Sequence, residues 1–108
     1  MRKLLLFGAI VIGLANLLSA EDEKAAIIAA TNRYVAANSS ISKINVTVEA
    51  TEGDFARVKI EPQEKGATDP AWVFLQKKDG IWTGLVLGTS FTTEDYQQLS
   101  IPNALRVP

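Results

Sequence analysis

The chain must do any chemistry with carboxylates, amines, phenols and hydroxyls, because it contains neither His nor Cys. Those two residue types supply the usual imidazole bases, thiolate nucleophiles and ligands for zinc or copper. Their absence excludes Ser-His-Asp and Cys-His catalytic systems. We therefore expect no metal centre and no cofactor.

Paired carboxylates are the remaining catalytic option, since two acids facing each other in a cleft can act as acid and base. The candidates are Glu49 with Glu61 and Glu52 with Asp54. The first pair falls on the polar face of expected strands and the second in an expected turn, which favours a solvated surface. Residues 21–23 are all acidic, but they lack the spacing of a calcium loop and suit a helix N-terminus instead. We expect a protein that is not an enzyme, with a carboxylate-dependent hydrolase as an alternative.

The first twenty residues have the pattern of a secretory signal peptide. A basic head at residues 1–3 precedes an apolar run of about 15 residues, and small side chains follow at Ser19 and Ala20. The run is short for a membrane-spanning helix, which needs roughly 20 apolar residues. We expect cleavage after Ala20 and export to the periplasm or the extracellular medium. An uncleaved leader would be the only contact with a membrane.

Residues 21–108 are long enough for a single small domain. Loss of Arg2 and Lys3 with the leader leaves nine Lys and Arg against twelve Asp and Glu, a net charge of −3. That balance lacks the clustered positive charge that nucleic acid requires. Without Cys the domain has no disulfide bonds, so packing alone must stabilise it.

The first half of this domain predicts a helix followed by two strands. Residues 21–38 have apolar side chains at helical spacing, in a stripe made by Ile27, Ile28, Thr31, Tyr34 and Val35. Residues 44–50 and 56–61 alternate between apolar and polar side chains, as half-buried strands do. The turn between the strands falls at residues 51–54, and a polar loop follows at residues 62–70.

The second half predicts a β-hairpin and a short helix. Apolar runs at residues 71–78 and 81–87 flank Asp79-Gly80, a pair that favours a two-residue type I′ turn. That turn sets Lys78 opposite Ile81 and Phe74 opposite Leu85. Thr92 or Thr93 can cap a helix that ends near Leu99.

Together these elements predict an α+β fold, with one N-terminal helix packed on a four-stranded antiparallel meander and a short C-terminal helix. The order of elements resembles the cystatin-like and nuclear-transport-factor-like group of helix-on-curved-sheet folds over residues 21–91. The C-terminal pattern is similar to one in small exported bacterial proteins, and its residues are Gly88-Thr89, Phe91, Tyr96, Leu99 and Ile101-Pro102. The resemblance implies a fold and carries no activity with it.

An apolar outer face on the predicted hairpin is the main candidate binding site. Its residues are Val73, Leu75, Val86 and Trp82, with Lys77 opposite Trp82. Apolar patches that stay uncovered mark interaction sites, and Trp is enriched at binding hot spots. Either the C-terminal tail covers this face, or it binds a partner protein or a second copy. We therefore expect an exported binding or accessory domain, which could act as an inhibitor or an assembly factor.

A pocket between the helix and the sheet is the second candidate site. Folds of this outline often hold a ligand there, and Tyr34, Trp72, Phe74 and Asp69 could line the pocket. Such a protein would be a small-ligand carrier. The alternative is that these aromatic side chains belong to the core, because a short chain has little volume to spare.

Overall fold

The computed structural model describes residues 20–41, 43–64 and 69–107, so residues 1–19 of the expected signal peptide and residues 65–68 of the expected 62–70 loop lie outside the described residues. The elements are, in chain order, α2 (Ala20–Asn38), β1 (Ile44–Glu52), β2 (Phe55–Pro62), β3 (Ala71–Lys78), β4 (Ile81–Gly88), α3 (Thr93–Leu99) and the 3-10 turn η1 (Asn103–Leu105). In the part of the chain that is described, no helix has both the length and the apolar character needed to cross a membrane.

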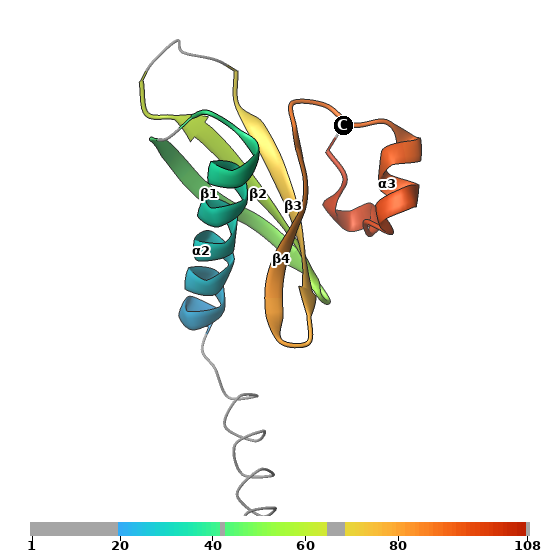
Figure 1. Cartoon of the computed structure of the whole chain (residues 1–108). Helices are drawn as coiled ribbons and strands as arrows, with labels where there is room; N and C mark the ends of the chain where they lie inside the picture. The colour runs from blue at the N-terminus through green and yellow to red at the C-terminus, as the bar shows by residue number, and fades with distance from the viewer. Residues whose placement is uncertain (1–19, 42, 65–68, 108) are drawn as a thin grey trace, which may run out of the picture.

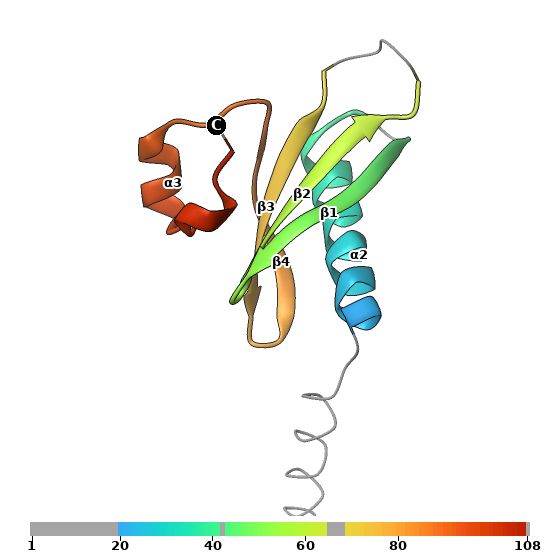
Figure 2. The same ribbon diagram turned by 180° about the vertical axis from the view of Figure 1, so that it is seen from behind.

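The four strands form one antiparallel sheet in the order β1-β2-β3-β4, so β1 and β4 are its edges. Helix α2 lies along one face of this sheet, and the C-terminal segment (residues 89–107) lies on the other side (Figures 1 and 2). The α+β arrangement predicted from the sequence is therefore confirmed, with the sheet as the middle of three layers.

Helix α2 buries one stripe against the sheet. Ile27, Ala30, Thr31 and Val35 are buried, at the three- and four-residue spacing that puts side chains on one helical face. The buried hydroxyl of Thr31 donates a hydrogen bond to the carbonyl of Ile27 at 2.8 Å, so this polar group is satisfied inside the core. Three acids occupy the first turn, where they complement the helix dipole.

The side chains that face α2 alternate along the strands. On the central strands β2 and β3 alternate residues are buried under the helix, namely Ala56, Val58, Ile60, Val73 and Leu75, and Trp82 of the edge strand β4 joins them. Alternation follows from the two-residue repeat of a β-strand. These residues and the helix stripe make the first hydrophobic core.

A second core lies between the sheet and the C-terminal segment. Phe74 is fully buried there, and its ring makes edge-on contacts with Phe91 and Tyr96 at centroid distances of 5.2 and 5.7 Å. Ile101 and Leu105 are also buried in this core. Edge-on geometry is the arrangement that aromatic quadrupoles prefer. The C-terminal segment is thus held on the sheet by a hydrophobic core of its own.

Polar contacts also hold the C-terminal segment. The hydroxyl of Tyr96 accepts from the backbone N–H of Val107 at 3.0 Å and lies 3.2 Å from the carbonyl oxygen of the same residue, to which it donates. Arg57 of β2 donates from Nη1 to the carbonyl of Leu105 at 2.9 Å. Helix α3 begins with a capping box between Thr92 and Asp95, so the first of the two expected caps is the one used.

The β3–β4 hairpin confirms the predicted turn and corrects the predicted register. Asp79 and Gly80 both have positive φ, 52° and 80°, as a type I′ turn requires. Pairing runs as expected from Lys78 opposite Ile81 to Leu75 opposite Gly84, and then a β-bulge places Phe74 opposite Val86. The expected pairing of Phe74 with Leu85 is wrong, because Leu85 is the extra residue of the bulge.

Candidate functional site

The apolar residues predicted to form an outer hairpin face belong to the protein interior. Val73 and Leu75 are fully buried, and Trp82 is 7% exposed, all three in the core beneath α2. The bulge moves Val86 to the opposite side, where it packs beside Phe74. The expected exposed patch is therefore wrong, because its strands are covered by the helix on one side and the C-terminal segment on the other.

Lys77 lies opposite Trp82 as predicted, but both side chains are engaged by Glu23 of α2. One oxygen of this carboxylate, Oε2, accepts from Lys77 Nζ at 3.1 Å and from the indole N–H of Trp82 at 2.6 Å. The ammonium group also lies 5.9 Å from the indole centroid. The hydrogen bond from Lys77 is the largest cause, and that from Trp82 the next, of a pKa of Glu23 below its ordinary value. This cluster ties the start of α2 to the hairpin.

The predicted ligand pocket is not assembled. Tyr34 lies on α2, whereas Trp72 and Phe74 belong to the core on the other side of the sheet. Trp72 donates its indole N–H to Glu49 Oε1 at 3.0 Å, and Asp69 is exposed just before β3. Since the sheet separates Tyr34 from the other two aromatic residues, the three do not line one cavity.

The candidate acid pairs do not form an enclosed site. Glu49 pairs with Arg57, with Nε and Oε1 2.9 Å apart, whereas Glu61 lies opposite Asn45 at the other end of the β1–β2 ladder. Glu52 at the end of β1 and Asp54 in the turn are both exposed. Across the described residues, no group of three or more acidic side chains is placed to hold a metal ion.

Strand β4 is an apolar strand at an open edge of the sheet. Within residues 20–41, 43–64 and 69–107, no backbone hydrogen bond joins the outer side of β4 to another segment. The strand is rich in apolar side chains, and Ile81 at its start is 63% exposed. An edge strand of this kind presents unpaired N–H and C=O groups to solvent.

One hollow adjoins this edge on the side of α2, and we call it the helix-side hollow. Its volume is about 320 Å³, and its lining comprises Ala30, Arg33, Tyr34, Ile81, Trp82, Thr83 and Gly84. The small residues Ala30 and Gly84 belong to the helix and the strand that border it. The ring of Tyr34 lies against Gly84.

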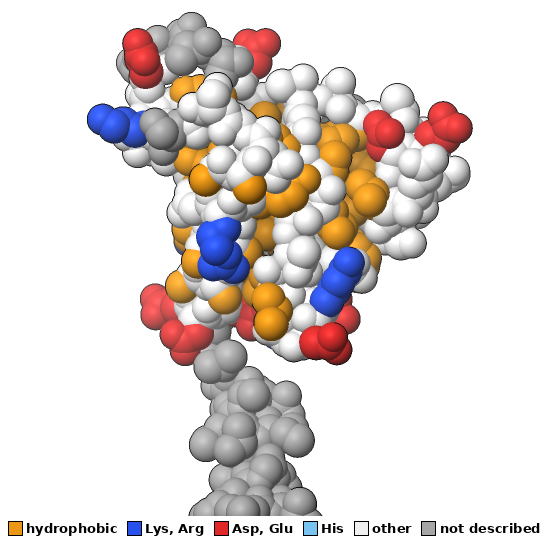
Figure 3. Space-filling model, in the orientation of Figure 1, with side chains coloured by type: hydrophobic (Ala, Val, Ile, Leu, Met, Phe, Trp, Pro, Cys, Tyr) orange, Lys and Arg blue, Asp and Glu red, His pale blue; other side chains and the backbone are white. Residues whose placement is uncertain are grey.

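A second hollow adjoins the same strand on the side of the C-terminal segment, and we call it the tail-side hollow. It measures about 310 Å³ and is lined by Leu85, Val86, Leu87, Gly88, Ser90, Phe91, Asp95, Gln98 and Leu99. The bulge contributes to this hollow, because it places both Leu85 and Val86 against the second core, between the sheet and the C-terminal segment. Hydrophobic side chains gather on the molecular surface over β4 and between β4 and α3 (Figure 3).

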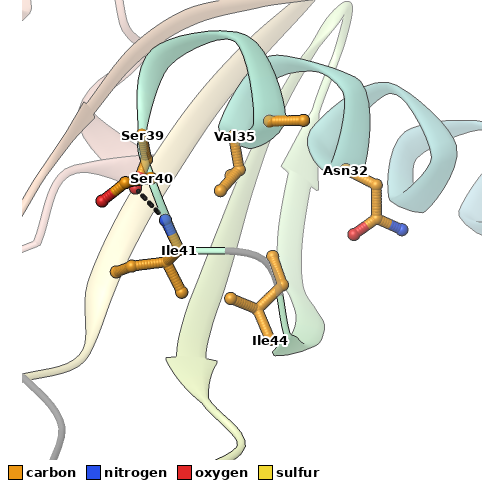
Figure 4. A pocket seen from close by; sticks show the side chains of 7 residues that line it. Asn32, Val35, Ser39, Ser40, Ile41 and Ile44 are labelled. Atoms are coloured by element: carbon orange, nitrogen blue, oxygen red, sulfur yellow. Dashed lines mark hydrogen bonds between the residues drawn. The ribbon is translucent and has the colours of Figure 1, made fainter.

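The opposite edge has a different character. On β1 every second side chain is exposed and polar, and these residues are Asn45, Thr47, Glu49 and Thr51. A further hollow of about 380 Å³ lies beside the end of α2, between Val35, Ser39, Ile41 and Ile44 (Figure 4). There the backbone N–H of Ile41 donates to Ser39 Oγ at 3.1 Å. Neither feature combines a free apolar edge with hollows on both sides.

The β4 edge was not singled out by reasoning from the sequence, although two signals for it were present. A meander leaves its last strand at an edge, and a Gly such as Gly84 within an apolar strand often marks a bulge or a close approach.

The chain was compared with protein-family models, curated protein sequences and solved structures, and none of the three comparisons found a match. The assignment of a site therefore rests on the geometry of this chain.

Proposed function

We propose that this protein is an exported, non-enzymatic binding domain that captures an extended segment of another protein along the free edge of β4. The observation that carries the proposal is the pair of hollows on opposite sides of that strand. The leader-like residues 1–20 support export, and the lack of His and Cys supports a role in binding.

The mechanism follows from the geometry of an added strand. Backbone groups of β4 would pair with those of the incoming segment and supply affinity. Neighbouring side chains of a strand point to opposite sides of the sheet, so they would enter the helix-side and tail-side hollows in turn. The bulge at Leu85 interrupts the edge, so a regular ladder is expected along residues 81–84. The rest of the segment would lie over Leu85 and Val86.

A charged side chain in the middle of the edge tests this function. Thr83 on β4 and Thr47 on β1 are both exposed strand residues, so Lys at either position leaves the cores intact. Lys on an edge strand opposes strand addition. Random 12-residue peptides would be selected by display on the wild-type protein, and their affinities would then be measured on Thr83→Lys and Thr47→Lys.

We expect the selected peptides to protect β4 amides from hydrogen exchange. We also expect them to lose about tenfold or more in affinity on Thr83→Lys, a change of about 1.4 kcal/mol, and to bind Thr47→Lys normally. Selection of no peptide would contradict the proposal, as would peptides that protect β1 or bind both variants equally.

A small-ligand carrier is the second candidate function, and the hollow beside the end of α2 is the observation that favours it. Its volume of about 380 Å³ falls within the range of ligand pockets, and Val35, Ile41 and Ile44 contribute apolar side chains to a lining that also includes Ser39. A ligand that binds there would raise the melting temperature. A panel of medium- and long-chain fatty acids should then stabilise the wild-type protein, but not Ala36→Phe, because Ala36 also lines the hollow and a larger side chain there would fill it. No shift with any of them would remove this candidate.

A further inference from the structure

Arg33 is the charged group of the helix-side hollow. It is exposed on α2 and shares the lining with Tyr34 and Gly84. Among the described residues the ion pairs join Arg57 to Glu49 and Lys77 to Glu23, and neither includes Arg33. The carboxylate of Glu23 is already occupied by Lys77 and Trp82. A guanidinium group thus lies beside a free strand edge without an acidic partner in the described part of the chain.

We infer that the captured segment carries an acidic side chain opposite Arg33 and an apolar side chain at the neighbouring position; this inference rests on the proposed function. The guanidinium group can bind a carboxylate through two parallel hydrogen bonds. The methylene groups of the acidic residue would contact Tyr34 and Ala30. The next side chain points to the other side of the sheet and would enter the tail-side hollow, beside Leu85 and Val86.

The charge of Arg33 also distinguishes an acidic partner from a second copy of this chain. If two copies paired through β4 about a two-fold axis, the helix-side hollows of both would lie along the same seam. Each copy would then bring an Arg33 to that seam, and like charges across an interface are unfavourable. A segment that carries a carboxylate would instead be attracted by the guanidinium group of Arg33.

Charge reversal at Arg33 tests the inference. Random 12-residue peptides would be selected separately on the wild-type protein, on Arg33→Glu and on Lys24→Glu. Lys24 is an exposed cation on the same helix but lines a different hollow, near Val48 and Thr51, so its reversal changes net charge equally. The sedimentation coefficient of the wild-type protein without peptide would report self-association.

We expect Asp or Glu at one position of the peptides from the wild-type and Lys24→Glu selections, and Lys or Arg at that position from Arg33→Glu. Changing the acid of a wild-type peptide to its amide should weaken binding about two- to fivefold, the range of an exposed ion pair. Peptides that protect β4 without this preference would overturn the inference and leave the proposed function standing. A dimer abolished by Thr83→Lys would also overturn it, whereas failure to select any β4-binding peptide would overturn the proposed function itself.

Discussion

The ring of Tyr34 lies so close to Gly84 that residue 84 has no room for a side chain. A Cβ atom there would overlap Cγ and Cδ1 of the ring and crowd its Cβ. Those atoms are near the helix backbone, so the ring cannot move away without moving α2. The contact holds the middle of the helix against the edge strand and borders the helix-side hollow.

Gly84→Ala should therefore lower the free energy of unfolding by about 1–3 kcal/mol, the usual cost of overpacking. Urea denaturation would measure the loss. In a Tyr34→Ala background the same substitution should cost less than about 1 kcal/mol, because the clashing ring is gone. An equal cost in both backgrounds would show that the contact does not limit residue 84.

The Tyr96 hydroxyl should stabilise the docked C-terminal segment. Tyr96→Phe removes the hydrogen bonds with both backbone groups of Val107 and should cost about 0.5–1.5 kcal/mol. Tyr34→Phe is a matched control, since its hydroxyl has no hydrogen-bond partner in the described part of the chain. Urea denaturation and hydrogen exchange at the Val107 amide would report the change. Equal effects of the two substitutions would contradict this role.

Arg57 should be a second attachment point for the same segment. Arg57→Met removes the bond to the Leu105 carbonyl and the ion pair with Glu49, and we expect a loss of about 1–2 kcal/mol. Hydrogen exchange of residues 101–107 should accelerate. Lys59→Met, on the same strand, should change stability by less than about 0.5 kcal/mol. If exchange in residues 101–107 stays at the wild-type rate, Arg57 does not hold the segment.

Glu23 should make stability depend on pH. Lys77 and Trp82 lower its pKa in the folded protein from the ordinary 4.5, so the unfolded chain binds this proton at higher pH than the folded chain does. The stabilisation is complete above the unfolded pKa and is lost as pH falls through the lowered folded pKa. Wild type should exceed Glu23→Gln in stability near neutral pH, with the difference shrinking below about pH 4.5.

Urea denaturation of both proteins across this pH range would measure the effect. In a Lys77→Met background the pH dependence of the difference should be smaller, because the largest cause of the lowered pKa has been removed. A difference between wild type and Glu23→Gln that is constant with pH would contradict the assignment.

Much of the secondary structure was predictable because its signals are local. Helix α2 was predicted from the acids at residues 21–23 and from the spacing of Ile27, Thr31 and Val35. The hairpin turn was predicted from Asp79-Gly80. These signals depend on neighbours within a few residues along the chain. The candidate sites were less predictable, because they depend on which residues meet across the sheet.

The sequence by itself determined the element order and the α+β class. It also determined that the chain lacks the chemistry that His and Cys side chains supply. Only the tertiary structure decided which side of β3 faces α2, because Val73, Phe74 and Leu75 are all apolar and alternation does not distinguish the two sides. It also decided the bulge at Leu85, which moves Val86 to the tail side. A bulge of one residue exchanges the faces of every residue beyond it, and its position is set by packing against α2 and the C-terminal segment, which are distant in sequence.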